Sequence, residues 1–163
     1  MNQIERIKEN LIKAINLAGK EIDSNMIEII DAGCPHKIQS LPSRKMAIYA
    51  FFHKNECLKI GKVNSNSNAR YNYQHYNPDS SKSNLAKSLL SDNNFLGNNT
   101  FNNIGNWIKE NTRRINIIIP QNVGIFVLNF CEAFLQLNFK PKYEGFKSQR
   151  GLIYYVWERW INR

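Results

Sequence analysis

One carboxyl group stands out because it lies inside an apolar segment. Residues 124–139 (GIFVLNFCEAFLQLNF) are apolar almost all the way round a helical wheel, which predicts a helix buried on most sides. Glu132 falls in line there with four apolar side chains: Ile125, Leu128, Leu135 and Phe139. An unpaired carboxylate in such surroundings costs several kcal/mol. We therefore expect a partner for Glu132, either a lysine or arginine or a divalent cation.

A phenol and an ammonium group lie on two strand-like runs that predict a hairpin. The runs are residues 46–53 (MAIYAFFH) and 57–63 (CLKIGKV), with residues 54–56 between them. Side chains alternate along a strand, so a three-residue loop places Tyr49 and Lys59 on one face of the sheet. A two-residue loop places them on opposite faces. We expect the three-residue loop.

Four pieces stand in a set order along the chain: Ala47-Ile48-Tyr49, Lys59-Ile60-Gly61, Arg70 and Glu132. This order resembles the GIY-YIG nuclease family, whose two signature tripeptides lie on adjacent strands and whose arginine follows on the first helix. The single metal-binding glutamate of that family begins a segment that ends in a basic-Pro-basic-aromatic turn, and residues 140–143 (KPKY) reproduce this turn. The resemblance covers about residues 45–145.

The chain departs from the family's pattern at several positions. The first signature glycine is Ala47, the second signature tyrosine is Lys59, and the asparagine that often closes the glutamate segment is Glu144. A lysine at the second tyrosine position also occurs in members similar to restriction endonucleases. The family's histidine or tyrosine four residues after the arginine falls on Gln74, which is flanked by Tyr73 and His75, and both neighbours stay open as candidates.

The resemblance implies hydrolysis of a phosphodiester by water with one divalent metal. Arg70 would offer its planar fork of donors to the scissile phosphate, whose charge grows in the transition state. Glu132 would hold Mg²⁺ or Mn²⁺, which accept one or two carboxylates and complete their coordination with water and phosphate oxygens.

The resemblance leaves two candidates for the base. Tyr49 would contact or deprotonate the attacking water, which its ordinary pKa of about 10 permits only if nearby cations stabilise the phenolate. Lys59 and Lys62 are the cations available, and in the expected hairpin Lys59 lies beside Tyr49. His75 is the alternative base, because an imidazole titrates near neutral pH without help.

The expected fold is α/β (α+β), with a small three-stranded antiparallel sheet flanked by helices. We expect helices at residues 3–20, from about 24 to 33, and at 68–76, 83–91, 107–114 and 124–139, and a third strand at 115–120. The domain organisation is an N-terminal helical extension (1–43), a nuclease-like core (44–145) and an aromatic C-terminal segment (146–163) that packs on the core.

The charge balance favours a polyanionic partner. The chain has 163 residues, with 22 Lys and Arg against 13 Asp and Glu, a formal net charge of +9. We expect DNA, most simply a duplex, and a possible homodimer for cutting both strands. The candidate contacts are Lys62, Tyr73, Lys87, Lys140 and Lys142, with further basic side chains such as Arg113 and Arg114. The alternatives are a surface charge that serves only solubility and a catalytically inactive nucleic-acid-binding module.

The expected compartment is the cytoplasm. Three cysteines cannot all pair, the first residues lack the order of a signal peptide, and no apolar run is long enough to span a bilayer. The resemblance implies a role in restriction, phage defence or mobile-element biology. A competing constellation of Cys34, His36, His53 and Cys57 could bind zinc, provided that His53 and Cys57 meet across the hairpin.

Overall fold

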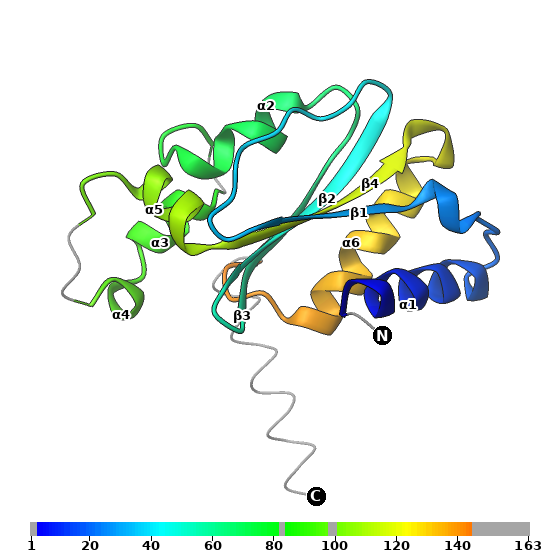
Figure 1. Cartoon of the computed structure of the whole chain (residues 1–163), viewed down its shortest axis with the longest axis horizontal. Helices are drawn as coiled ribbons and strands as arrows, with labels where there is room; N and C mark the ends of the chain where they lie inside the picture. Colours follow the sequence, from blue (N-terminus) through cyan, green and yellow to red (C-terminus); the bar gives the residue numbers. More distant parts are fainter. Residues whose placement is uncertain (1–2, 82–83, 98–100, 145–163) are drawn as a thin grey trace, which may run out of the picture.

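The computed structural model describes residues 3–81, 84–97 and 101–144, which form a four-stranded antiparallel sheet with helices on both faces (Figure 1). The strands are β1 (Glu28–Gly33), β2 (Lys45–His53), β3 (Glu56–Val63) and β4 (Arg113–Pro120), in the order β1-β4-β2-β3. The α-helices are α1 (Gln3–Leu17), α2 (Asn68–Asn72), α3 (Leu85–Leu90), α4 (Asn93–Leu96), α5 (Ile104–Asn111) and α6 (Ile125–Phe139). Three short 3₁₀ helices are η1 (Ser24–Met26), η2 (Gln74–Tyr76) and η3 (Gln121–Val123). The mixed α/β class is confirmed, with four strands instead of three.

The additional strand is β1, in a segment that we predicted as a helix ending at Gly33. That prediction is wrong: a single 3₁₀ turn, capped by the Asp23 carboxylate, leads directly into the strand. β-branched residues favour a pleated surface, and Ile29 pairs with Ile117 of β4. Residues before position 43 therefore contribute a strand to the same sheet as the rest of the chain.

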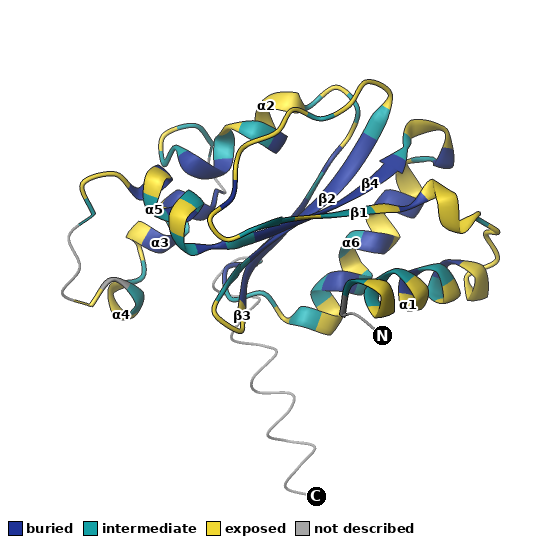
Figure 2. Cartoon of the chain, viewed as in Figure 1, coloured by how far each residue is buried: buried dark blue, intermediate teal, exposed yellow. Residues whose placement is uncertain are grey.

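Two apolar clusters cover the two faces of the sheet (Figure 2). One cluster joins α1 and α6 to side chains such as Ile48 of β2. The other joins α2, η2, α3 and α5 to Tyr49 and Phe51 of the same strand. Because neighbouring residues of a strand face opposite ways, β2 contributes to both clusters, and Tyr49 lies on the face covered by α2 and α3.

The β2–β3 hairpin differs from the prediction in its loop but not in its consequence. Its turn has two residues, Lys54 and Asn55, so the three-residue loop is wrong. A β-bulge follows, because Phe52 pairs with Cys57 whereas Phe51 pairs with Lys59. The extra residue shifts the alternation by one. Lys59 therefore shares a face with Phe51, the face that also carries Tyr49.

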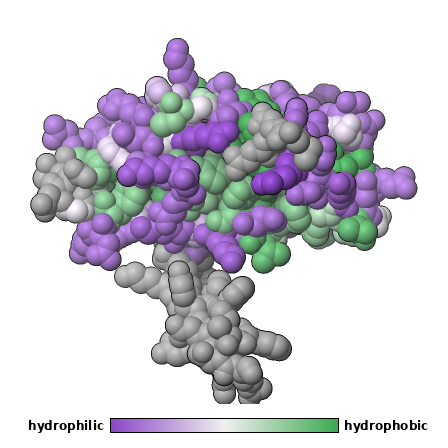
Figure 3. All heavy atoms as spheres, turned by 60° about the horizontal axis from the view of Figure 1, so that its bottom comes forward, coloured by the Kyte–Doolittle hydropathy of each residue, from purple (hydrophilic) through white to green (hydrophobic). Residues whose placement is uncertain are grey.

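Helix α6 is confirmed in position, but it is not buried on most sides. Its buried face contains Val127, Leu128, Cys131 and Leu135. Phe126 is 84% exposed and Leu137 is 74% exposed, with Phe130 between them on one stripe of the helix. Apolar surface is visible on the side of α1 and α6 (Figure 3). The apolar composition predicted burial on most sides, but only one face of the helix packs on the sheet, so apolar side chains on another face stay exposed.

The remaining differences are local. The helix predicted at 107–114 ends at Asn111, and Arg113 and Arg114 begin β4 instead. The helix predicted at 68–76 is interrupted at Tyr73, between α2 and η2. The aromatic C-terminal segment lies outside the described residues. Among the helices that are described, none combines the length and apolarity needed to cross a membrane.

Candidate functional site

Tyr49 is at the centre of the site that the signature residues form. Its side chain is fully buried, and its ring lies over Gly61, its partner on β3. A Cβ atom at position 61 would stand 2.5 Å from the Tyr49 Oη. Because β3 is the edge strand, the missing side chain lets the phenol reach the edge of the sheet. This close approach is a steric reason for glycine at that position.

Two side chains from the segment after β3 contact the Tyr49 hydroxyl. Arg70 of α2 donates from Nε to Oη at 3.2 Å, and the Nε2 of His75 in η2 lies 2.6 Å from the same oxygen. Arg70 is otherwise exposed, whereas His75 is buried. The structure therefore brings Tyr49, Arg70 and His75 together as one hydrogen-bonded group.

The tautomer of His75 follows from its second ring nitrogen. The backbone N–H of Leu85 donates to Nδ1 at 3.3 Å, so this nitrogen is an acceptor. Burial, followed by the charges of Lys59 and Arg70, holds the pKa of His75 well below its ordinary value. A neutral ring with Nδ1 as acceptor carries its proton on Nε2. His75 thus donates to Tyr49 Oη, as Arg70 does.

The pKa of Tyr49 is raised above its ordinary value, mainly because burial penalises the phenolate. The charges of Arg70 and Arg114 and the hydrogen bond from Arg70 act in the opposite direction. Two donors aimed at one oxygen also favour its ionised form. The cation nearest to the phenol oxygen is therefore Arg70, rather than the lysines that the sequence suggested.

Glu132 has a lysine partner, which was one of the two alternatives. Its Oε2 lies 2.5 Å from the Nζ of Lys62 on β3, and the glutamate side chain is 16% exposed. α6 packs on the face opposite to Tyr49, yet the charge of Glu132 acts on the pKa values of both Tyr49 and Arg70. The carboxylate therefore lies within electrostatic range of both groups, approaching the β3 edge from the other side.

Lys59 is held by the segment that follows α6. Its Nζ donates to the backbone carbonyl of Tyr143 at 3.1 Å and lies 3.9 Å from Oε2 of Glu144. The lysine side chain is 3% exposed and that of Glu144 is 32% exposed. The two largest departures from the family's pattern, Lys59 and Glu144, thus lie against each other with opposite charges.

Arg114 is a residue of this site that sequence reasoning misread. Instead of a surface contact for phosphate, it is a buried side chain, 2% exposed. Its guanidinium donates to Asn116 Oδ1 at 2.9 Å, Tyr76 Oη at 2.8 Å and the Tyr71 carbonyl at 2.7 Å. It also lies 4.6 Å from the centroid of the Tyr71 ring and 5.7 Å from that of Tyr49. The alternation along β4, where Arg114 is in line with the buried Ile118, was the signal available.

The candidate nucleic-acid contacts lie in different surroundings. Tyr73 is 54% exposed beside the site, and Lys87 is exposed on α3. Lys140 is exposed at the end of α6, whereas Lys142 pairs with Asp92 at 3.1 Å. Lys62 forms an ion pair with Glu132. Arg113 is paired through two nitrogens with Asp31.

The four residues of the zinc alternative do not gather into one site. His36 bonds to Thr112 and Tyr76, His53 to the Asn111 carbonyl, and Cys34 to the Glu110 carbonyl. In the described part of the chain, no group of three or more histidine, cysteine, aspartate or glutamate side chains is placed to hold a metal ion. A single carboxylate such as Glu132 is a smaller donor set than such a group.

No protein-family model matches this chain, and no curated protein or solved structure matches it either.

Replacing Arg114 should cost far more stability than replacing its neighbour Arg113. We expect Arg114→Lys to lower the free energy of unfolding by about 3 kcal/mol or more, since an ammonium cannot replace three directed donors inside an aromatic cluster. Arg113→Lys, at the half-exposed pair with Asp31, should cost about 1 kcal/mol or less. Urea unfolding of both variants checks this, and equal losses would contradict it.

Stability should fall as the pH falls from about 6.5 toward 5. The folded-state pKa values of His75 and His36 are lowered, chiefly by burial, so below 6.5 the unfolded chain binds more protons than the folded chain. Each histidine contributes a slope of up to about 1.4 kcal/mol per pH unit. In urea unfolding between pH 5 and 7, His75→Gln should show a shallower slope than the unmodified chain. An unchanged slope would mean that His75 is not held neutral.

Proposed function

We propose that this protein is a metal-dependent endonuclease of the GIY-YIG type that hydrolyses DNA phosphodiester bonds. The observation that carries the proposal is the group around Tyr49. A phenol on β2, a guanidinium on α2 and an imidazole on η2 share one oxygen, with the Glu132 carboxylate of α6 in electrostatic range. Four separate elements supply these groups: β2, α2, η2 and α6.

In this proposal Tyr49 is the base, and His75 is the residue that positions it. Both ring nitrogens of His75 are engaged within the protein: Nδ1 accepts from the Leu85 N–H and Nε2 donates to Tyr49 Oη, so neither nitrogen can take a proton from water. With Nε2 and the Arg70 Nε both donating to Oη, the phenol's own proton points elsewhere. Tyr49 is fully buried in this structure, so the proposed role requires that substrate binding open its hydroxyl to water. The phenol proton then passes through that water to solvent and leaves a phenolate held by two donors, ready to accept a proton from the attacking water.

Arg70 serves both the base and the phosphate. Its Nε is committed to Tyr49. The residue is exposed overall, so its terminal nitrogens are available to a phosphate at the surface. The same cation then stabilises the phenolate and the growing charge of the phosphate in the transition state.

Glu132 is the residue that would hold a metal ion. A partly exposed carboxylate suits Mg²⁺ or Mn²⁺, which bind proteins through one or two carboxylates together with water and phosphate oxygens. When bound, the ion would neutralise charge on the phosphate. The pairing of Glu132 with Lys62 competes with the ion, so we expect weak metal binding until nucleic acid is present.

The Lys59–Glu144 contact favours an active nuclease over a module whose catalytic residues have been lost. A lysine that replaced the second signature tyrosine by chance would leave an uncompensated buried cation, which is costly. Here the second departure supplies the opposite charge, 3.9 Å away. The two departures together therefore preserve a filled, charge-balanced position on the strand next to Tyr49.

The second candidate function is an inactive nucleic-acid-binding module. The Lys62–Glu132 ion pair favours it, because an ammonium group already pairs with the carboxylate that would hold the metal ion. Such a module would keep the basic surface and bind DNA in the presence of EDTA without cutting it.

The proposal includes two further expectations. Cutting both strands requires two sites, and we assign the exposed α6 stripe of Phe126, Phe130 and Leu137 to contact with a second copy of the chain. The three cysteines are free thiols, which supports the cytoplasm as the place of action.

Supercoiled plasmid and single-stranded RNA, incubated with the protein and Mg²⁺ or Mn²⁺, test the proposal. We expect nicked and then linear plasmid, with linear product rising more steeply than protein concentration if two copies act together. Glu132→Ala and Arg70→Ala should each lower the rate by about 100-fold or more. Glu110→Ala and Arg113→Ala, the matched controls, should cut normally. Binding in EDTA without cleavage of any substrate would favour the inactive module.

Replacing Lys59 and Glu144 together should cost less unfolding free energy than replacing Lys59 alone. Lys59→Tyr alone removes the ammonium group 3.9 Å from Glu144, whereas Lys59→Tyr with Glu144→Asn restores the pattern that the family resemblance implies. We expect the double variant to recover about 1 kcal/mol or more of the unfolding free energy lost by the single one. Combining Lys59→Tyr with Glu110→Asn, at an exposed glutamate, should recover nothing. Additive losses for the 59/144 pair would show that the two residues are independent.

A further inference from the structure

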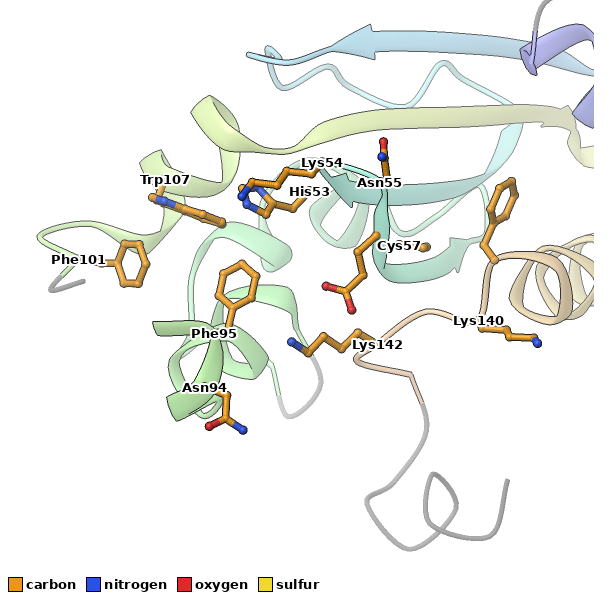
Figure 4. Close-up of a pocket in the computed structure, with 12 residues that line it drawn as sticks. His53, Lys54, Asn55, Cys57, Asn94, Phe95, Phe101, Trp107, Lys140 and Lys142 are labelled. Carbon is orange, nitrogen blue, oxygen red and sulfur yellow. The ribbon is translucent and has the colours of Figure 1, made fainter. Parts of the chain in front are cut away.

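An open pocket of about 840 Å³ lies beside the β2–β3 turn (Figure 4). The β2–β3 turn, α4, α5 and the chain just after α6 meet there. The proposed nuclease chemistry does not use it. Its lining combines aromatic rings with lysine side chains, which is an uncommon pairing for a patch that only needs to be soluble.

The aromatic wall of the pocket is made of four rings: His53, Phe95, Phe101 and Trp107. The Trp107 ring is central to them, with centroids 5.2 Å from His53, 5.4 Å from Phe95 and 5.3 Å from Phe101. The Asn111 carbonyl fixes the His53 ring through Nδ1 at 2.9 Å. Rings that support one another in this way are preorganised, so little side-chain entropy is lost when a ligand stacks on them.

The charges around the wall select the ligand. Lys54, Lys140 and Lys142 line the pocket together with the Glu56 carboxylate, and Lys142 is also paired with Asp92 at 3.1 Å. The lysines still outnumber the two carboxylates. The Lys142 ammonium also lies 5.2 Å from the centroid of the Phe95 ring. An excess of lysines beside the rings would repel a cationic ligand. A ligand that is both flat and anionic fits these surroundings.

We propose that this pocket binds an unpaired nucleotide of single-stranded nucleic acid, with its base on the aromatic wall and the neighbouring phosphates on the lysines. Every base has a π-face, so stacking on such a wall needs no particular sequence. A base inside a duplex is covered by its neighbours and could not reach the rings.

The pocket is placed to act on the same strand as the site around Tyr49. His53 and Tyr49 lie four residues apart on β2, with side chains on one face, a separation of about 13 Å at 3.3 Å per residue. This is roughly four nucleotide steps along one strand of B-DNA. If the protein is a nuclease, the pocket makes branched or partly single-stranded DNA its favoured substrate. This substrate preference rests on the proposed nuclease function, whereas binding of a single strand to the pocket does not.

Fluorescence anisotropy of a labelled 12-nucleotide oligo(dT), measured with the full chain in EDTA, tests the pocket without cleavage. We expect tighter binding of this oligonucleotide than of a 12-base-pair duplex. Phe101→Ala should weaken oligo(dT) binding about fivefold or more, the lower end for loss of one stacking partner. Lys54→Gln should weaken it about threefold and reduce its dependence on salt. The matched controls, Leu17→Ala and Lys13→Gln, both exposed on α1, should bind as the unmodified chain does.

The outcomes separate the two proposals. Lys54 is exposed in the hairpin turn, so its variant keeps the fold even if Phe101→Ala loses stability in thermal unfolding. Arg70→Ala should lose cleavage and keep oligo(dT) binding. Pocket-dependent binding without cleavage by any variant would uphold the pocket and overturn the nuclease. Oligo(dT) affinity that neither pocket variant changes, or a clear preference for the duplex, would overturn the pocket proposal.

Discussion

The arrangement around Tyr49 depends on a buried cation, the guanidinium of Arg114. Helices α2 and η2 carry Arg70 and His75, but they have five and three residues and could not persist alone. Arg114 attaches them to β4 by donating to the Tyr71 carbonyl and the Tyr76 hydroxyl. Hydrogen bonds from a buried charge are strong, and a broken one leaves that charge unsatisfied. The position of Arg70 and His75 over Tyr49 therefore rests on a residue from a strand on the far side of β2.

A sheet edge explains how groups from opposite faces act at one place. Tyr49 passes over Gly61 on one face, while Glu132 meets Lys62 on the other, and both positions lie on the edge strand β3. If β3 were a central strand, the strands on both sides of it would keep these two groups apart. At the edge, the partly exposed Glu132 can approach the same place as Tyr49, and its ion pair with Lys62 keeps the glutamate from remaining an isolated charge.

The sequence was informative where a chemical constraint is local. The order of the signature residues predicted that Tyr49 and Arg70 come together, and the lone acid in an apolar helix predicted a partner for Glu132, which is Lys62. It was less informative where packing decides. β1 could not be separated from a helix because a short apolar run fits either, and Arg114 was taken for a surface residue because its burial depends on rings contributed by distant segments.

The hairpin shows that the site requires a pairing register and not one particular turn. Between the Tyr49–Gly61 pair and the tip, three residues have no partner, the two of the turn and Leu58 in the bulge. A longer turn without a bulge would give the same odd number and the same facing of Lys59. Length changes in this hairpin are thus compatible with an intact centre as long as unpaired residues of the turn or the bulge absorb them and Tyr49 still pairs with Gly61. Within that restriction the tip, which also borders the aromatic pocket, is free to diversify while the arrangement around Tyr49 stays in place.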